Sequence, residues 1–303
     1  MTQTVLILGG SGKIGTHAAE AFWNAGWTVR QYDRATGDMT AAAMGADVIV
    51  NGLNPANYAN WAKNIPAITR QVIAAAKASN ATVMIPGNIY NFGNQPGALN
   101  ETTPQIPHTR KGKIRVEMEQ AYRDAGVRTI VLRAGNFIDP NHNADVMSLF
   151  ILREAKRAKI AYSGAPDIAQ AYAYMPDWAR AAVALAEMRE TLADFEDIPF
   201  PGHSFDMVAL KAHLDRVTGR TFRLTAFPWW IMTAISPFVE MARELGEMRY
   251  LYEMDHWIGA KKFNRLLPDF QPTPLGEVME AGLPADIHPN KAVRPSSQPI
   301  AAE

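Results

Sequence analysis

Hydrophobic and polar residues follow two different patterns along the first half of the chain. Five short apolar runs have the length of β-strands, and between them lie longer segments whose apolar residues recur every three or four positions, as on one face of a helix. The expected strands are 4–10, 28–33, 46–53, 81–87 and 127–135, and the expected helices include 13–27, 65–80 and 111–125. Strands that alternate with helices predict an α/β fold with a doubly wound parallel sheet, covered on both faces.

The pattern changes beyond about residue 140. Helical spacing dominates there, and Pro and aromatic residues become frequent, so we expect a smaller, mostly helical lobe that holds a substrate. Trp229, Trp230 and Met232 are candidates for lining an apolar pocket in it. The expected helices are 144–158, 177–193, 206–217 and 229–263.

These patterns predict three parts of the chain. The doubly wound domain spans 1–140, and the substrate lobe spans 141–287 and is partly interleaved with it. The last part, 288–303, is rich in Pro, Ser and Ala and should be extended or disordered.

Composition narrows the classes of function. The 303 residues include 30 basic and 30 acidic side chains, so no net charge would attract nucleic acid or an anionic membrane. The absence of Cys excludes disulfides, zinc–thiolate sites and cysteine nucleophiles. The histidines show no metal-ligand spacing, so no metal is expected. With no signal peptide and no membrane-length apolar run, a cytoplasmic protein is expected.

A glycine-rich turn joins the first expected strand to the first expected helix. The stretch LILGGSGKIG places Gly9, Gly12 and Gly15 at the spacing G-x-x-G-x-x-G. In this context the first glycine permits a tight turn, the second lets the backbone approach a pyrophosphate, and the third lets the helix pack on the sheet. Lys13 and Ile14 open the helix, whose N-terminus favours phosphate. The turn therefore predicts a Rossmann-type dinucleotide site, with a plain strand–helix turn as the alternative.

The end of the second expected strand bears on the choice of cofactor. Asp33 could accept hydrogen bonds from the adenosine ribose of NAD, whereas Arg34 could pair with the 2′-phosphate of NADP. Both residues are present, so NAD and NADP stay open. Because Asp33 would repel a phosphate, NAD is slightly favoured.

Several segments in chain order resemble motifs of the extended short-chain dehydrogenase/reductases, the NAD-dependent epimerase/dehydratase family. The glycine spacing is the first. The later ones are NIYNFG (88–93), ETTPQIP (101–107), VLRAGNFIDP (131–140), YAYMPDWARAAVALAE (172–187) and FQPTPLGEVMEAGL (270–283). In VLRAGNFIDP, Asp139 stands where glycine is usual in the family motif. The resemblance runs from about residue 4 to 284, and it implies a Rossmann-type fold and places Asn136 and Phe137 where cofactor and substrate meet.

The same resemblance implies a Ser/Thr, a Tyr and a Lys as catalytic residues, the last two at Tyr-x-x-x-Lys on one helix. In HTRKGKIRVEME (108–119), Lys113 fits the lysine position and is expected to point inward to the nicotinamide ribose, with a surface lysine as the alternative. Four residues earlier stands Thr109, and the serine position holds at best Asn88. A threonine hydroxyl is far less acidic than a phenol. Tyr90 could supply a phenol from the neighbouring loop, although it could equally be a packed aromatic.

Two functions follow from this resemblance. One is an NAD(P)-dependent oxidoreductase, epimerase or dehydratase with a non-standard triad, acting on a sugar nucleotide or a related carbonyl or hydroxyl compound. The other is a catalytically degenerate NAD(P) sensor, similar to the NmrA-like regulators. A purely structural scaffold would leave the glycine loop unexplained. The resemblance also implies a homodimer formed through helices beside the sheet.

Overall fold

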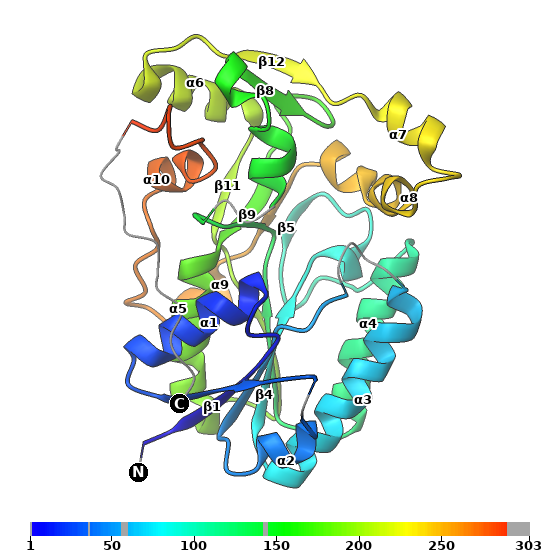
Figure 1. The fold of residues 1–303 in the computed structure, drawn as a ribbon, viewed down its shortest axis with the longest axis vertical. Coiled ribbons are helices and arrows are strands. Elements are labelled where there is room, and N and C mark those ends of the chain that lie inside the picture. The colour runs from blue at the N-terminus through cyan, green and yellow to red at the C-terminus, as the bar shows by residue number, and fades with distance from the viewer. Residues whose placement is uncertain (1, 36, 56–59, 142–144, 290–303) are drawn as a thin grey trace.

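A parallel sheet forms the base of the molecule, and most of the second half of the chain is assembled above its carboxyl edge (Figure 1). The computed structural model describes residues 2–35, 37–55, 60–141 and 145–289. The sheet has six strands in the order β10-β6-β4-β3-β1-β2, all parallel. These strands are β1 (Thr4–Leu8), β2 (Thr28–Tyr32), β3 (Val48–Asn51), β4 (Thr82–Gly87), β6 (Thr129–Arg133) and β10 (Phe195–Pro199).

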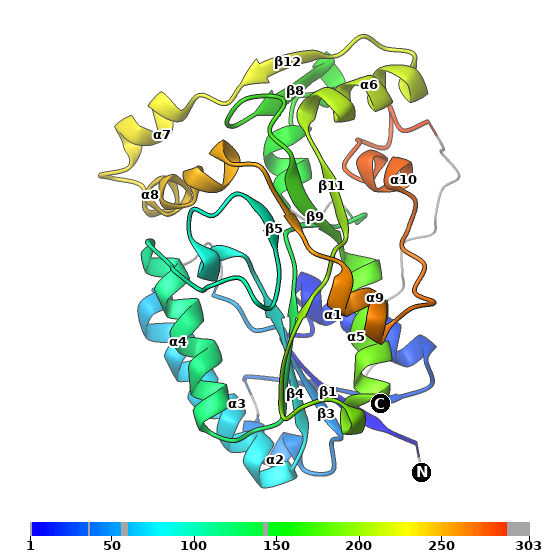
Figure 2. The same ribbon diagram turned by 180° about the vertical axis from the view of Figure 1, so that it is seen from behind.

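Helices cover both faces of this sheet, because its strands are apolar on both sides. In β1, Val5 and Ile7 pack against one set of helices while Leu6 and Leu8 pack against the other. Figure 2 shows the two helical layers on opposite sides of the strands. One layer consists of α1 (Lys13–Asn24) and α5 (Met175–Glu187), and the other of α2 (Met39–Ala43), α3 (Trp61–Ser79) and α4 (Arg110–Asp124). The expected doubly wound α/β fold is confirmed.

The order of the strands defines a switch point in the sheet. The chain leaves β1 on one side to form β2 and then crosses back to form β3 on the other side of β1. Ligands of open α/β sheets bind where the direction reverses, outside the carboxyl ends of the strands. A ligand-binding site is therefore expected at the loops after β1 and β3.

The second half of the chain contains strands as well as helices. One small sheet consists of β7 (Asn136–Ile138), β9 (Gln170–Tyr174) and β11 (His203–Phe205), and two further pairs are β8 (Lys159–Tyr162) with β12 (Arg223–Ala226) and β5 (Gly97–Leu99) with β13 (His256–Ile258). The helices are α6 (Met207–Thr218), α7 (Trp229–Ile235), α8 (Glu240–Glu247), α9 (Lys261–Leu266) and α10 (Leu275–Glu280).

These elements correct several expectations for the second half. The helix expected at 206–217 is α6, but the one expected at 229–263 is two short helices, a 3₁₀ turn (Arg249–Glu253), a strand and the start of α9. Within 144–158 the described residues form a π turn (Met147–Ile151) and a 3₁₀ turn (Ala155–Arg157). Apolar spacing alone did not distinguish these short turns and strands from long helices, because short apolar runs suit both.

Two other expectations concern segments outside the sheet. No helix in the described part of the chain is long and apolar enough to cross a membrane. The tail expected to be extended or disordered, 288–303, lies almost wholly outside the described residues.

Candidate functional site

The glycine loop between β1 and α1 is shaped by contacts that exclude side chains. Gly9 has a φ of +76°, a left-handed conformation that favours glycine. A methyl group on Gly15 would lie 2.2 Å from the Gly9 carbonyl oxygen, so no other residue fits there without moving the loop. A methyl group on Gly12 would meet only that same oxygen, at 3.2 Å. Gly9 and Gly15 thus shape the turn, while Gly12 leaves space beside its backbone that a side chain would fill.

The loop after β3 closes against this turn at the switch point. A methyl group on Gly9 would lie 3.1 Å from the Gly52 carbonyl carbon, and one on Gly52 would lie 2.9 Å from the Leu8 carbonyl oxygen. Backbone therefore packs directly on backbone where β1 and β3 end. Gly52 was not singled out from the sequence, although its position directly after an apolar run could have indicated it.

Helix α1 begins at this turn without a side-chain cap. Its N-cap is Gly12, which offers no side chain to cap the helix, and the Thr16 N–H donates the first helical hydrogen bond to the Gly12 carbonyl at 2.8 Å. The amides of Ile14 and Gly15 precede that bond and have no acceptor within the helix. Aligned amides and the positive end of the helix dipole suit the pyrophosphate of a dinucleotide. The residues present therefore fit such a cofactor.

A polar cluster lies behind the first turn of α1. The His17 ring nitrogen Nε2 lies 3.0 Å from Asp139 Oδ1, and the Asp139 amide donates to Asp145 Oδ2 at 2.6 Å. Burial lowers the pKa of the Lys13 ammonium, and the nearby carboxylates of Asp145 and Asp139 partly offset that effect. Burial acts to raise the pKa of Asp139, but the His17 ring and the Asn141 amide outweigh it and lower that pKa. One residue of this cluster stood out in the sequence, namely Asp139 at a position where glycine is usual.

Asp33 and Arg34 are both exposed just beyond β2, the edge strand of the sheet. Asp33 Oδ1 accepts a hydrogen bond from the Ala35 amide at 2.8 Å, which fixes the turn after the strand. Both side chains thus lie at the carboxyl end of the strand next to β1. The preference between NAD and NADP stays a prediction.

Asn88 and Tyr90 follow β4 and shape the next loop. Asn88 Oδ1 accepts from the Tyr90 amide at 3.0 Å, at the start of a 3₁₀ turn (Tyr90–Phe92). Its carbonyl oxygen accepts from Arg133 Nη1 at 2.6 Å. Arg133 is buried and also pairs with Glu119 and Asp197, so it joins β6, α4 and β10 to this loop. The half-buried Tyr90 ring packs on two apolar clusters.

The first turn of α4 differs from the arrangement that the sequence predicted. Thr109 is the N-cap of the helix, is 6% exposed, and its hydroxyl oxygen accepts from the Gly112 amide at 3.1 Å. Lys113 is exposed. The buried positions on this helix, among them 111, 114, 118 and 122, form a face that does not include Lys113, so its contact with the nicotinamide ribose stays a prediction.

Lys111 is the lysine that points inward. It is 0% exposed, and its Nζ contacts Glu247 Oε2 at 3.0 Å and the Glu244 carbonyl at 3.0 Å. It also forms an ion pair with the Glu244 carboxylate, which pairs with Arg110 too. These contacts fasten α8 to the start of α4. The period of the buried positions in 110–124 could have identified Lys111 from the sequence, but its acidic partners lie more than 130 residues away.

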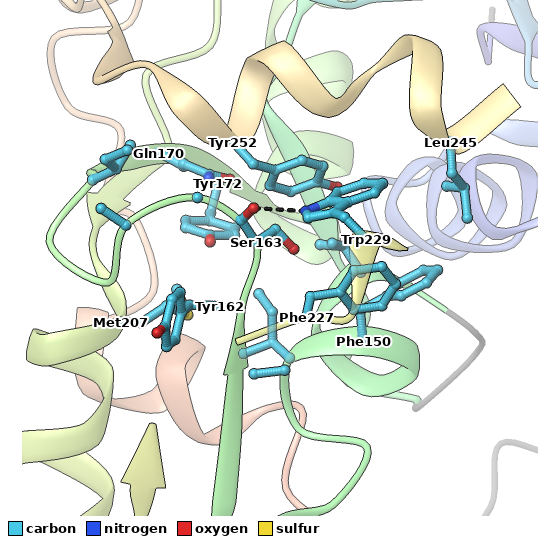
Figure 3. A pocket seen from close by; sticks show the side chains of 16 residues that line it. Phe150, Tyr162, Ser163, Gln170, Tyr172, Met207, Phe227, Trp229, Leu245 and Tyr252 are labelled. Carbon is cyan, nitrogen blue, oxygen red and sulfur yellow. Dashed lines mark hydrogen bonds between the residues drawn. The ribbon is translucent and has the colours of Figure 1, made fainter. Parts of the chain in front are cut away.

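An aromatic pocket lies in the second half, between the β8–β9 segment and the α7–α8 region (Figure 3). Phe150, Phe227, Trp229 and Tyr252 form much of its wall, and the Trp229 indole nitrogen donates to the Ser163 carbonyl at 2.7 Å. Of the aromatic candidates, Trp229 lines this pocket, whereas Trp230 is 74% exposed.

The pocket is joined to the end of the sheet by hydrogen bonding. Asn136, in the strand just after β6, donates from Nδ2 to Gln170 Oε1 at 3.3 Å, and Gln170 lines the pocket. Asp145, beside the polar cluster behind α1, directly precedes the lining residue Val146. The glycine loop and the pocket are thus linked through β7 and residues 145–146.

Comparison with known proteins identifies relatives of this chain. A sequence profile of the NAD dependent epimerase/dehydratase family matches residues 5–198, which is more than half of the chain. Among curated proteins, no sequence gives a significant match.

Solved structures give the same fold at low identity. A candidate epimerase from Burkholderia cenocepacia J2315 has a TM-score of 0.71 and 19% identity, over 91% of this chain and 95% of its own. UDP-glucuronic acid 4-epimerase from Bacillus cereus, solved with UDP-glucuronic acid and NAD, has a TM-score of 0.71 and 14% identity, over 92% and 98%. UDP-glucose 4-epimerase from Brucella ovis, solved with NAD, has a TM-score of 0.69 and 16% identity, over 92% and 97%. The chain belongs to the NAD-dependent epimerase/dehydratase family.

Proposed function

We propose that this protein binds a nicotinamide dinucleotide, NAD or NADP, and acts on a sugar nucleotide or a related carbonyl or hydroxyl compound as an oxidoreductase, epimerase or dehydratase. The observation that carries the proposal is the glycine loop at the switch point, where α1 begins at Gly12 without a side-chain cap. Two of the similar structures contain NAD, and one of them also contains a UDP-sugar, which supports the proposal.

The cofactor contacts follow from the geometry of the loop. In this proposal the pyrophosphate lies against Gly12 and the amides of Lys13 and Ile14, while Gly9 and Gly15 keep the backbone close. The Lys13 ammonium adds positive charge beside the phosphates. Asp33 and Arg34 contact the adenosine ribose end, and Asp33 favours NAD because its carboxylate would repel a 2′-phosphate.

Catalysis in this proposal uses a non-standard set of side chains. When bound, the nicotinamide ring would take up or donate a hydride, and the protein must then move a proton to or from the substrate oxygen. Tyr90 is the candidate phenol near the start of α4, with Asn88 beside it as a hydrogen-bonding group. The Thr109 hydroxyl oxygen already accepts one hydrogen bond to cap α4, which leaves its proton and one lone pair for a substrate oxygen. Lys113 contacts the ribose only if its exposed side chain folds back over the helix start.

The second candidate function is an NAD(P)-binding sensor without turnover. The first turn of α4 favours it, because Thr109 caps the helix, Lys113 is exposed, and Lys111 is held by Glu244 and Glu247. A sensor would keep the glycine loop and lose the proton-transferring groups.

Fluorescence titration with NADH and NADPH, followed by a turnover screen over sugar nucleotides and simple carbonyl compounds, tests both candidates. Binding with turnover supports the enzyme, and binding without turnover across the screen supports the sensor. If neither dinucleotide binds, both candidates are wrong. Replacing Lys113 by Ala weakens dinucleotide binding if the side chain reaches the ribose and leaves the affinity unchanged if it stays on the surface.

A further inference from the structure

The aromatic pocket has a lining without charge. Among the described residues that form it, none has an acidic or basic side chain, and six are aromatic. Figure 3 shows Trp229, Phe227 and Phe150 on one side of it and Tyr172 and Gln170 on the other. Such a lining stacks on flat apolar groups and offers nothing to neutralise a charged ligand.

Two polar side chains in this lining are more than nine-tenths buried. Tyr172 is 1% exposed and its ring stacks on Phe205 with the centroids 4.1 Å apart, yet its hydroxyl has no hydrogen-bond partner anywhere in the described part of the chain. Gln170 is 7% exposed and uses its carbonyl oxygen to accept from Asn136, which leaves the amide nitrogen as a donor. A ligand that fills the pocket would cover these two donors, and a covered polar group without a partner is costly, so an oxygen acceptor from the ligand is the expected partner.

The Tyr172 phenol acts as a donor at neutral pH. Burial raises its pKa well above the usual range, and Tyr252 and Asp206 raise it further. The hydroxyl therefore keeps its proton and can donate it in a hydrogen bond to a neutral oxygen.

The same lining is poorly suited to a sugar nucleotide. Two phosphates would need cationic partners, and the sugar hydroxyls would lose their hydrogen bonds to water on burial. A guanidinium does lie against the Trp229 ring, that of Arg249, with its Cζ 5.5 Å from the ring centroid. Its Nε, however, already donates to Glu253 Oε1 at 2.8 Å.

We propose that the pocket takes a neutral aromatic carbonyl compound or alcohol, whose ring lies among Phe150, Phe227 and Trp229 and whose oxygen accepts a hydrogen bond from Tyr172. This narrows the substrate class and rests on the proposed function for its role in a reaction. Binding to the pocket, however, needs no dinucleotide, so it can be measured separately.

The test is ligand-observed NMR titration of the full chain without dinucleotide, using 4-phenyl-2-butanone, uridine and UDP-glucose as probes. We expect the aryl ketone to bind in preference to both nucleosidic probes. Tyr172→Phe keeps the stacked ring and removes only the hydroxyl, so it should weaken ketone binding about threefold to tenfold. Thermal melting of each variant reports whether the fold is kept.

Tyr250→Phe is the matched control. The Tyr250 hydroxyl is buried without a partner among the described residues, but it does not line the pocket. Its removal should leave ketone affinity unchanged. The inference is overturned if the ketone does not bind, if uridine or UDP-glucose binds more tightly and displaces it, or if both Tyr variants behave like the wild type. A chain that binds the ketone but not NADH or NADPH would refute the proposed function and leave the pocket assignment standing.

Discussion

The glycine loop and the first turn of α4 are two helix starts at the same edge of the sheet, and they use their backbone amides in opposite ways. At α1 the N-cap is Gly12, and no described side chain caps the helix by a hydrogen bond. At α4 the Thr109 hydroxyl accepts from the Gly112 amide, and Glu247 Oε1 accepts from the Lys111 amide at 2.8 Å. The first helix start is open to an anion, whereas the second is closed by the protein's own side chains.

The largest loss of stability is expected from replacing Lys111, the buried lysine of α4. Lys111→Met removes the partner of two acidic side chains, one of which, Glu244, is only 1% exposed. Loss of Lys111 leaves the buried Glu244 carboxylate with only the exposed Arg110 as a cationic partner, so the free energy of unfolding should fall by about 3 kcal/mol in urea denaturation. Lys113→Met, two residues along on the exposed face, is the matched control and should change it by less than about 0.5 kcal/mol. Equal effects of the two variants would contradict the assignment of Lys111 as the inward lysine.

A smaller loss of stability is expected when the pH is lowered. Burial acts to raise the pKa of Glu244, but hydrogen bonds from Lys111 and Arg110 outweigh it and lower that pKa. A lowered folded-state pKa gives stability that is present above the unfolded value of 4.5 and is lost as the pH falls through the folded value. Stability measured between pH 7 and pH 3 should therefore fall below about pH 4.5, and less steeply in Lys111→Met. The same slope in both proteins would show that other carboxylates are responsible.

The next largest change in stability is expected from Thr109, the N-cap of α4. Thr109→Ala removes the hydroxyl that caps α4 and should lower the free energy of unfolding by about 1 kcal/mol, whereas Thr109→Ser keeps the oxygen and should cost less. If Thr109 also binds substrate, the Ser variant should keep its turnover. The Ala variant should then lose more turnover than its lower fraction of folded protein accounts for. Chemical denaturation and a turnover assay on both variants separate the two roles.

How much could be predicted from the sequence depended on how far apart the interacting residues are. The strand, the three glycines and the start of α1 lie within about a dozen residues, and together they specified the turn. Lys111 meets acidic partners on α8, and no local pattern links segments that far apart. The sixth strand, β10, was missed because its sequence FEDIP includes two acidic residues, which suit an edge strand and weaken its apolar signal. The same limit hid the pairing of Asp139 with His17, which are 122 residues apart.

The central claim is that the open helix start at α1 binds a nicotinamide dinucleotide, and one pair of variants tests it most directly. Gly12→Ala places a methyl group where the pyrophosphate would approach, and Gly12 has a φ of −86°, which alanine adopts readily. Gly246→Ala, in α8, adds a methyl group with no atom within 4 Å and serves as the control. In NADH fluorescence titration we expect binding to the wild type and to Gly246→Ala, and at least about tenfold weaker binding to Gly12→Ala, with thermal melting of each variant to report whether the fold is kept. Equal NADH affinity in all three proteins, or no binding to any of them, would contradict the account.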